Sequence, residues 1–287
     1  MEFTCCKNII ALNLLFITQL PHISLADEPP IDSSSPTPTN PAGTLLQWSP
    51  HVSGAARLNQ ALVTDRPDFT EASVTVGKGI TQIEFGYTYI DGGDSELHSL
   101  GEALLRYGIL TNWLELRLGF LPLIENEQKG FADLYLGFKI ALTPQQGLLP
   151  EMAIIPQSFA PTGSQNFRSH GWEPGLNWVY SWQINDTLST AGSSQVNRRF
   201  NNEGNDFYEL AQSWTVSASL TEKIGAYSEW FALLPLGGSD SQNEHYLNGG
   251  FTYLINQNLQ ADIRVGWGLN EHAQDFFAGA GLSIRFQ

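Results

Sequence analysis

The sequence predicts an all-β protein: an antiparallel up-and-down transmembrane β-barrel of about twelve strands, preceded by a signal peptide and a disordered segment. First, apolar and polar side chains alternate in segments of about ten residues from Gly79 onward, as in barrel strands. Second, the connections between these segments are long and short in turn, and outer-membrane barrels pair long outer loops with tight periplasmic turns in this way. Third, charged residues make up 15% of the 287-residue chain, yet no apolar run approaches the ~18 residues of a membrane-spanning helix.

Residues 1–26 are predicted to form a signal peptide. Lys7 precedes an apolar stretch at 9–20, and the small residues at 24–26 resemble a cleavage site. A buried N-terminal helix is the alternative. The chain has two cysteines, Cys5 and Cys6, and both lie in this leader. The mature chain is therefore expected to have no disulfide and no reactive thiol.

Residues 27–61 are predicted to be a disordered linker, because this Pro-, Ser- and Thr-rich stretch contains too few apolar residues to fold alone. The barrel is expected over residues 62–287. Residues 62–78 precede the first strand and contain Arg66 and Asp68 beside Pro67. They form either a plug inside the barrel, with Arg66 bound to lumen carboxylates such as Glu84 or Glu115, or a periplasmic turn outside it.

The alternation predicts the strands in order along the chain. In the first, Ile83 and Phe85 share one face while Gln82 and Glu84 share the other. The number of strands is about twelve, and ten or fourteen strands also fit the sequence. The expected strands cover residues 82–89, 102–109, 113–120, 133–140, 151–157, 177–182, 188–195, 208–220, 224–234, 246–255, 260–267 and 278–286. Between them, residues 110–112, 185–186, 221–223 and 256–258 are expected as short turns, and 91–95, 125–130, 159–170, 197–206, 237–244 and 270–274 as long loops.

Alternation alone fits two arrangements, a soluble barrel with its charged face in water and a membrane barrel with its polar face in the lumen. The leader, the unequal connections and the aromatic strand ends favour the membrane. Tyr87 and Tyr89 would lie near the outer rim, and Trp182 and Phe286 near the inner one. We therefore expect the bacterial outer membrane of a Gram-negative cell, contact with its lipid and lipopolysaccharide, and insertion by the barrel-assembly machinery.

Several motifs resemble one family of barrels. The motif TDRPDFTE at residues 64–71 is followed by VGKG at 76–79 and QIEFG at 82–86. Weaker matches follow, with RYG at 106–108, ELRLG at 115–119, DLYLGFK at 133–139, PTG at 161–163, Glu209 and QSW at 212–214. Over residues 62–286 the chain resembles the transporter family named "putative MetA-pathway of phenol degradation". This resemblance implies a barrel distantly similar to long-chain fatty-acid and aromatic-hydrocarbon channels.

Charged residues recur on the predicted inward faces, where acids outnumber bases by seven to five when Arg285 is counted. In a narrow lumen they must pair, because an unpaired buried charge is costly. They form either a salt-bridged structural core or the lining of a substrate path. The candidate lumen residues are Arg66, Glu84, Glu102, Arg106, Glu115, Arg117, Asp133, Lys139, Glu209, Glu229, Asp262 and Arg264.

The chain is expected to be a channel or transporter for passive uptake of small compounds, hydrophobic or aromatic ones among them. The alternative is a non-conducting structural or adhesion barrel, and a third hypothesis is an outer-membrane hydrolase. His98, His170, His245 and His272 lie near predicted loops, some close to Ser95, Ser99 or Ser169, but no nucleophile motif accompanies them. We therefore expect no enzyme, no metal and no cofactor. The net charge of −15 argues against nucleic acid as a partner.

Overall fold

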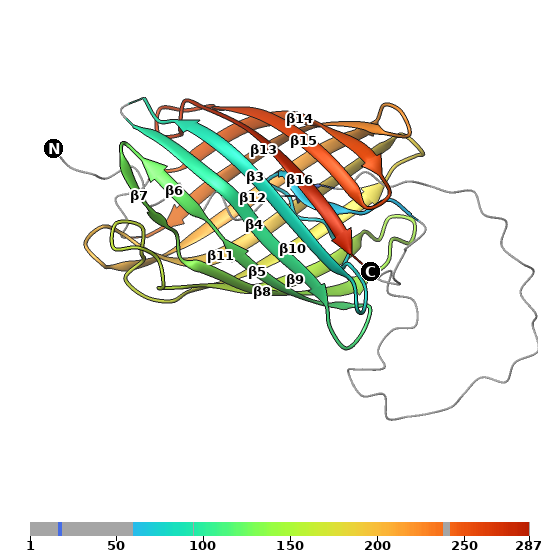
Figure 1. The fold of residues 1–287 in the computed structure, drawn as a ribbon, viewed down its shortest axis with the longest axis horizontal. Helices are drawn as coiled ribbons and strands as arrows, with labels where there is room; N and C mark the ends of the chain where they lie inside the picture. The colour runs from blue at the N-terminus through green and yellow to red at the C-terminus, as the bar shows by residue number, and fades with distance from the viewer. Residues whose placement is uncertain (1–16, 19–59, 94, 238–241, 287) are drawn as a thin grey trace, which may run out of the picture.

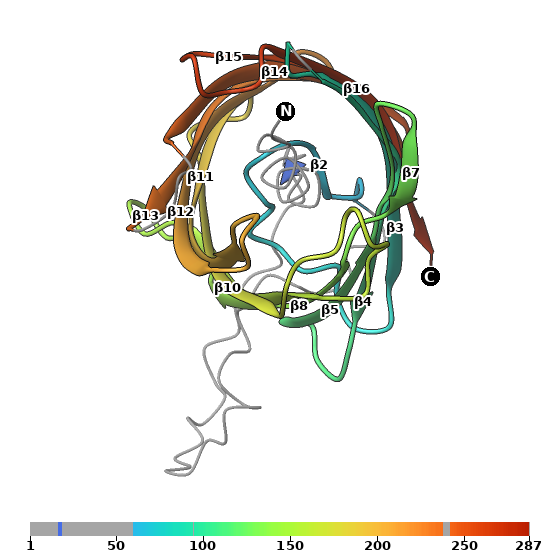
Figure 2. The same ribbon diagram turned by 90° about the vertical axis from the view of Figure 1, so that its left-hand side faces the viewer.

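The computed structural model describes residues 17–18, 60–93, 95–237 and 242–286, and in these residues twelve wall strands form a closed antiparallel barrel (Figures 1 and 2). This confirms the predicted fold class. Each wall strand pairs with its sequence neighbours, and β3 closes the ring by pairing with β16 from Thr81↔Phe286 to Asp91↔Phe276. The strands are β3 (Thr81–Asp91), β4 (Glu96–Gly108), β5 (Leu114–Phe120), β8 (Leu134–Thr143), β9 (Glu151–Ala160), β10 (Glu173–Gln183), β11 (Leu188–Phe200), β12 (Asp206–Ser219), β13 (Ile224–Leu236), β14 (Glu244–Asn256), β15 (Leu259–Gly268) and β16 (Phe276–Phe286).

Two short strands extend the wall beyond β5 and β8. Strand β6 (Pro122–Glu125) pairs with β4 at 97–99, and β7 (Gln128–Phe131) pairs with β6. The long loop predicted at 125–130 is therefore a hairpin. The loop predicted at 197–206 is also shorter, because β11 and β12 remain paired up to Phe200↔Asp206. Polar residues at the strand ends continue the backbone pairing here, and the alternation of apolar and polar residues does not reveal that.

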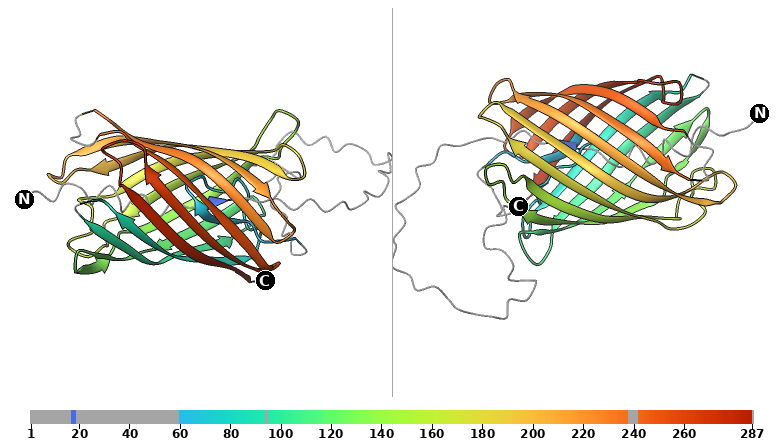
Figure 3. Two further views of the ribbon diagram at one scale, coloured as in Figure 1. Left: turned by 90° about the horizontal axis from the view of Figure 1, so that it is seen from above. Right: turned by 180° about the vertical axis from the view of Figure 1, so that it is seen from behind.

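The two ends of the barrel carry different connections, and Figure 3 shows the tilted strands between them from two sides. Connections 109–113, 144–150, 184–187, 220–223 and 257–258 lie at one end, called the short-turn end. Connections 92–95, 161–172, 201–205, 237–243 and 269–275 lie at the other, the long-loop end, together with the β6–β7 hairpin. Two connections depart from the alternation of long and short: connection 92–95 at the long-loop end is short, and connection 144–150 at the short-turn end is long.

Burial follows the predicted alternation along each wall strand. On β15, Gln260, Asp262 and Arg264 are buried, whereas Ile263 is 56% exposed. The exposed side chains of the wall are largely apolar and form the outer face, as expected for a barrel in lipid. Among the described residues, no helix is long and apolar enough to cross a membrane.

One segment of the chain lies inside the ring. Strand β2 (Thr64–Asp68) appears within the barrel in Figure 2, paired with the two-residue strand β1 (Ile17–Thr18). Every residue from 64 to 73 is buried, and we call residues 64–73 the inner segment. The predicted leader and linker fall outside the described residues, except for 17–18 and 60–61.

The inner segment enters and leaves the barrel at the short-turn end. Before it, the Leu62 amide donates to the Gln257 carbonyl, and after it, the Gly79 amide donates to the Gly108 carbonyl. At its deepest part the Phe69 ring stacks on Phe231, with 4.6 Å between ring centroids. The segment thus forms a loop folded into the lumen from one end.

Candidate functional site in the barrel lumen

Asp65 of the inner segment is the centre of a first charged cluster. Its carboxylate lies 2.8 Å from Lys139 Nζ on β8 and 3.2 Å from Arg106 Nη1 on β4. It also pairs with Arg117 on β5. All four side chains are fully buried. Three cations of the wall therefore converge on one carboxylate of the inner segment, which offsets their desolvation and fixes the segment against β4, β5 and β8.

Glutamates of the wall complete this first cluster. Arg106 makes a two-pronged contact with Glu115, with Nε–Oε1 at 2.8 Å and Nη2–Oε2 at 3.0 Å. The Asp65 amide donates to both oxygens of Glu84, at 2.9 and 3.0 Å. The Glu71 carboxylate lies 2.9 Å from Arg117 Nη2. The cluster thus binds the backbone as well as the side chains of the inner segment.

Arg66 forms a second cluster on the opposite face of β2. It pairs with Glu102 on β4 and, at 3.3 Å, with Asp262 on β15. The predicted partners Glu84 and Glu115 are therefore wrong, because these two bind Arg106. Two inward glycines make room for the guanidinium: an added Cβ would lie 2.1 Å from Arg66 Nη1 at Gly86 and 2.2 Å from its Nε at Gly281.

Arg264 joins the second cluster from β15. Its Nη1 donates to the Pro67 carbonyl at 3.0 Å, and its Nη2 donates to Thr88 Oγ1 at 2.7 Å. Nη2 also lies 3.8 Å from Glu102. Arg264 therefore links the wall to the backbone of the inner segment.

Glu229 on β13 binds the tip of the inner segment through hydrogen bonds. Its carboxylate accepts from the backbone amides of Phe69 at 2.6 Å and Thr70 at 2.7 Å, and from Asn248 Nδ2 at 2.7 Å. A carboxylate suits this position because buried backbone amides need an acceptor, and a charged acceptor binds them more strongly than a neutral one. The segment is thus attached to β13 directly, and Asn248 of β14 supports the same carboxylate.

The remaining predicted lumen residues lie apart from these clusters, near the long-loop end. Asp133 accepts hydrogen bonds from the amides of Gly163 at 2.8 Å and Ser169 at 2.9 Å, so it orders connection 161–172. Glu209 pairs with Arg199 at 3.2 Å. The structure therefore brings Arg66, Glu84, Glu102, Arg106, Glu115, Arg117, Lys139, Glu229, Asp262 and Arg264 to the inner segment, directly or through one another, and places Asp133 and Glu209 elsewhere.

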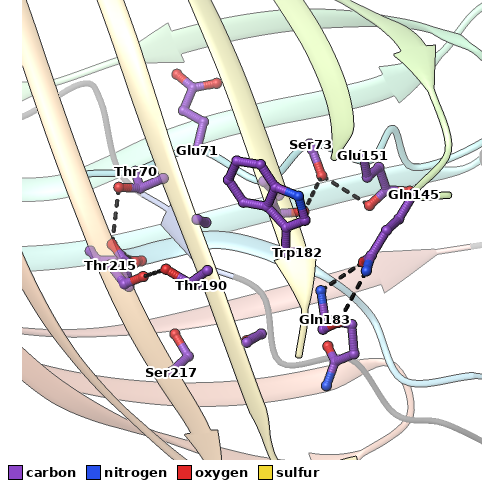
Figure 4. Close-up of a pocket in the computed structure, with 15 residues that line it drawn as sticks. Thr70, Glu71, Ser73, Gln145, Glu151, Trp182, Gln183, Thr190, Thr215 and Ser217 are labelled. Carbon is purple, nitrogen blue, oxygen red and sulfur yellow. Dashed lines mark hydrogen bonds between the residues drawn. The ribbon is translucent and has the colours of Figure 1, made fainter. Parts of the chain in front are cut away.

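A cavity of about 70 Å³ lies beside the inner segment near the short-turn end (Figure 4). Thr70, Glu71 and Ser73 line it from the inner segment. Wall residues complete the lining, among them Gln145, Glu151, Ser181, Trp182, Gln183, Ser189, Thr215 and Ser217. Ser73 Oγ donates to Glu151 Oε2 at 2.9 Å. The lining is rich in hydroxyl groups, which can bind water or a polar solute.

The loop histidines do not form a catalytic arrangement in the described residues. His98 Nδ1 lies 2.8 Å from the Tyr87 hydroxyl on the outer face, and His272 lies 3.6 Å from exposed Glu271. Ser169 donates to Asp133, within the contact that orders its loop. Across the part of the chain that the structure describes, no group of three or more His, Cys, Asp or Glu side chains could hold a metal ion.

Sequence reasoning missed the central position of Asp65. The segment from 64 to 78 shows no alternation, so nothing in it indicated which side chain faces which wall. The inward glycines were the available signal, because a glycine in a strand often marks the close approach of another group. Gly86 and Gly281 are register partners on β3 and β16, and Arg66 lies over both.

Comparison with known proteins gives one family and a set of similar folds. The family model described as "Putative MetA-pathway of phenol degradation" matches residues 64–286. An outer-membrane channel from Pseudomonas putida F1 superposes with a TM-score of 0.58 at 15% identity, covering 78% of this chain and all of that one. The KdgM porin gives a TM-score of 0.48 at 13% identity, covering 72% of this chain and 99% of that one. No curated protein sequence matched.

Proposed function

The chain belongs to the phenol-degradation family whose model matches residues 64–286, and on this basis we propose that it is an outer-membrane channel for passive uptake of small hydrophobic or aromatic compounds. Its fold is that of outer-membrane barrels, and a protein described as a channel shares that fold. The leader expected from the sequence and the apolar outer face support the same location.

The observation that carries the proposal is the uneven use of the wall by the inner segment. Apart from those of Ser73, its ion pairs and charged hydrogen bonds go to β3, β4, β5, β8, β12, β13 and β15. In the described residues, Ser73 contacts β9 and β10 at the short-turn end, through hydrogen bonds to Glu151 and Ser181. Between these contacts and the Glu173–Arg199 ion pair near the long-loop end, the inward side chains of β9 to β11 are uncharged, among them Ala153, Val179 and Ser193. A solute route along β9 to β11 fits this division.

The first alternative is a non-conducting structural barrel, and one observation favours it. Arg106, Arg117 and Lys139 are fully buried and each pairs with Asp65, as expected of a core that only keeps the barrel rigid. The two hypotheses differ in whether the wall from β9 to β11 borders a conducting path.

Planar-bilayer recordings of the refolded chain test the proposal with a pair of adjacent residues on β9. Ala153 faces inward and is fully buried, whereas Ile154 is its outward neighbour. Ala153→Trp should lower single-channel conductance severalfold because the indole enters the route, while Ile154→Trp should leave it unchanged. A folded wild-type barrel that shows no conductance would favour the non-conducting alternative.

A further inference from the structure

Strands β9, β10 and β11 carry a row of inward side chains that take no part in the two charged clusters. Asn177 on β10 lies in register with Ile155 on β9 and Gln195 on β11. The next inward row toward the short-turn end contains Val179 in register with Ala153. Directly opposite side chains on paired strands lie about 5 Å apart, so these residues form one continuous patch.

The two amides in this patch have unused hydrogen-bonding groups. Asn177 Oδ1 and Nδ2 and Gln195 Nε2 have no hydrogen-bond partner among the described residues, although the residues are 0% and 3% exposed. Burying an amide group without a partner costs about 1–3 kcal/mol. A position that leaves three such atoms unpaired is therefore expected to have a ligand for them.

A hydrogen-bond chain from the first cluster fixes which group Gln195 presents. Arg117 Nε donates to the Tyr135 hydroxyl at 3.3 Å, Tyr135 donates to Gln157 Oε1 at 3.2 Å, and Gln157 Nε2 donates to Asn197 Oδ1 at 3.0 Å. Asn197 Nδ2 then donates to Gln195 Oε1 at 3.4 Å. A guanidinium can only donate, so Arg117 fixes the direction of the first link, and the amide orientations in the structure continue that direction along the chain. The chain ends in the free donor of Gln195.

A glycine makes this chain possible. Gly175 on β10 lies in register between Gln157 and Asn197, and an added Cβ there would meet Asn197 Oδ1 at 2.0 Å. The Gln157–Asn197 hydrogen bond therefore crosses β10 over a position without a side chain. This arrangement holds Gln195 in one orientation.

Apolar side chains adjoin the two free amides. Ala153, Ile155 and Val179 form a separate hydrophobic cluster on the inward face, and each is 0% exposed. A ligand that fits the patch therefore needs an apolar body for this cluster and an oxygen atom for the Gln195 donor. Asn177 can both donate and accept, so it can also bind this oxygen atom when the oxygen belongs to a hydroxyl group.

We propose that Asn177, Gln195 and the apolar cluster of Ala153, Ile155 and Val179 form a solute-binding site for neutral molecules that carry a hydroxyl or carbonyl oxygen on an apolar, ring-sized body. The proposal deepens the proposed channel function, because the site lies on the wall assigned to the solute route. The two amides bind the oxygen atom of the solute, and the apolar cluster contacts its ring.

The test compares 4-fluorophenol with fluorobenzene by ¹⁹F NMR on the refolded full chain in nanodiscs, with empty nanodiscs as baseline. Gln195→Met and Asn177→Leu remove the amides at nearly constant volume, and each should weaken 4-fluorophenol binding about fivefold or more, the effect of one hydrogen bond of ~1 kcal/mol. Fluorobenzene binding should not change. Gln212→Met is the matched control, because this amide faces outward on β12, where it bonds Ser194 and Tyr180.

Equal binding of 4-fluorophenol by wild type and both variants would overturn the proposal, as would equal weakening by Gln212→Met. The heat-modifiable migration of each variant establishes that its barrel is folded, and Asn177→Leu retains the test if Gln195→Met does not fold. Conductance measured on the same preparations separates the two claims. Amide-dependent binding by a barrel that does not conduct would support this site and contradict the channel function.

Discussion

Lys139 on the barrel wall and Asp65 of the inner segment are joined by an ion pair of 2.8 Å between Nζ and Oδ1, and both side chains are fully buried. This contact joins residues 74 positions apart in the chain. Arg106 and Arg117 bind the same carboxylate. The inner segment therefore supplies a carboxylate to three buried wall cations, of which Arg106 and Arg117 also pair with Glu115 of the wall. Segment and barrel thus stabilise each other.

Asp65→Asn should destabilise the barrel strongly. It leaves Arg106, Arg117 and Lys139 with one carboxylate fewer, and breaking a buried ion pair costs about 3–5 kcal/mol. Urea unfolding of the barrel in lipid vesicles, followed by tryptophan fluorescence, measures the free energy. The matched control is Asp206→Asn, which removes an exposed partner of Arg198 and should change stability little. Equal stability of Asp65→Asn and wild type would contradict the role of this cluster.

Ile263→Arg should hinder insertion into a bilayer. Ile263 lies in the middle of β15 and is 56% exposed on the outer face. An arginine facing lipid near the midplane costs about 2–4 kcal/mol. Folding yields into vesicles, read from heat-modifiable migration on gels, provide the measurement, with Ile263→Leu as the control. Normal yields for the arginine variant would place this face away from lipid.

The orientation of the barrel can be tested by cysteine labelling. Gln165 lies exposed in connection 161–172, and Asp186 lies exposed in the turn 184–187 at the other end. A Gln165→Cys chain should react with an impermeant thiol reagent on intact cells, and an Asp186→Cys chain should react only after lysis. Cys5 and Cys6 lie in the predicted leader, and the wild-type chain, labelled in parallel, gives the background. The reverse labelling pattern would invert the orientation.

The alternation of side chains predicted the barrel and the inward faces, because in a strand the side-chain direction follows from position alone. It did not predict which inward residues meet. Arg66 binds Glu102 and Asp262, which lie 36 and 196 positions away, and neither was assigned to it. Contacts across a lumen depend on how far along the barrel axis each residue lies and on the path of the inner segment. The two-residue alternation gives information on neither.

Glu229→Gln should loosen the tip of the inner segment without unfolding the barrel. The variant keeps one oxygen acceptor but loses the charge that strengthens the hydrogen bonds of the Phe69 and Thr70 amides. Single-channel recordings should show more frequent transitions to higher conductance. Glu203→Gln, in the exposed connection 201–205, is the control. Indistinguishable traces for the two variants would mean that Glu229 does not restrain the segment.

The central claim is that the barrel conducts and that the inner segment narrows its lumen. The most direct measurement is the single-channel conductance of a chain lacking residues 64–73, recorded only from the heat-modifiable, folded fraction. We expect a larger conductance than that of the wild-type barrel, because all ten removed residues are buried inside it. A folded barrel without the segment whose conductance equals that of the wild type would show that the segment does not narrow the lumen.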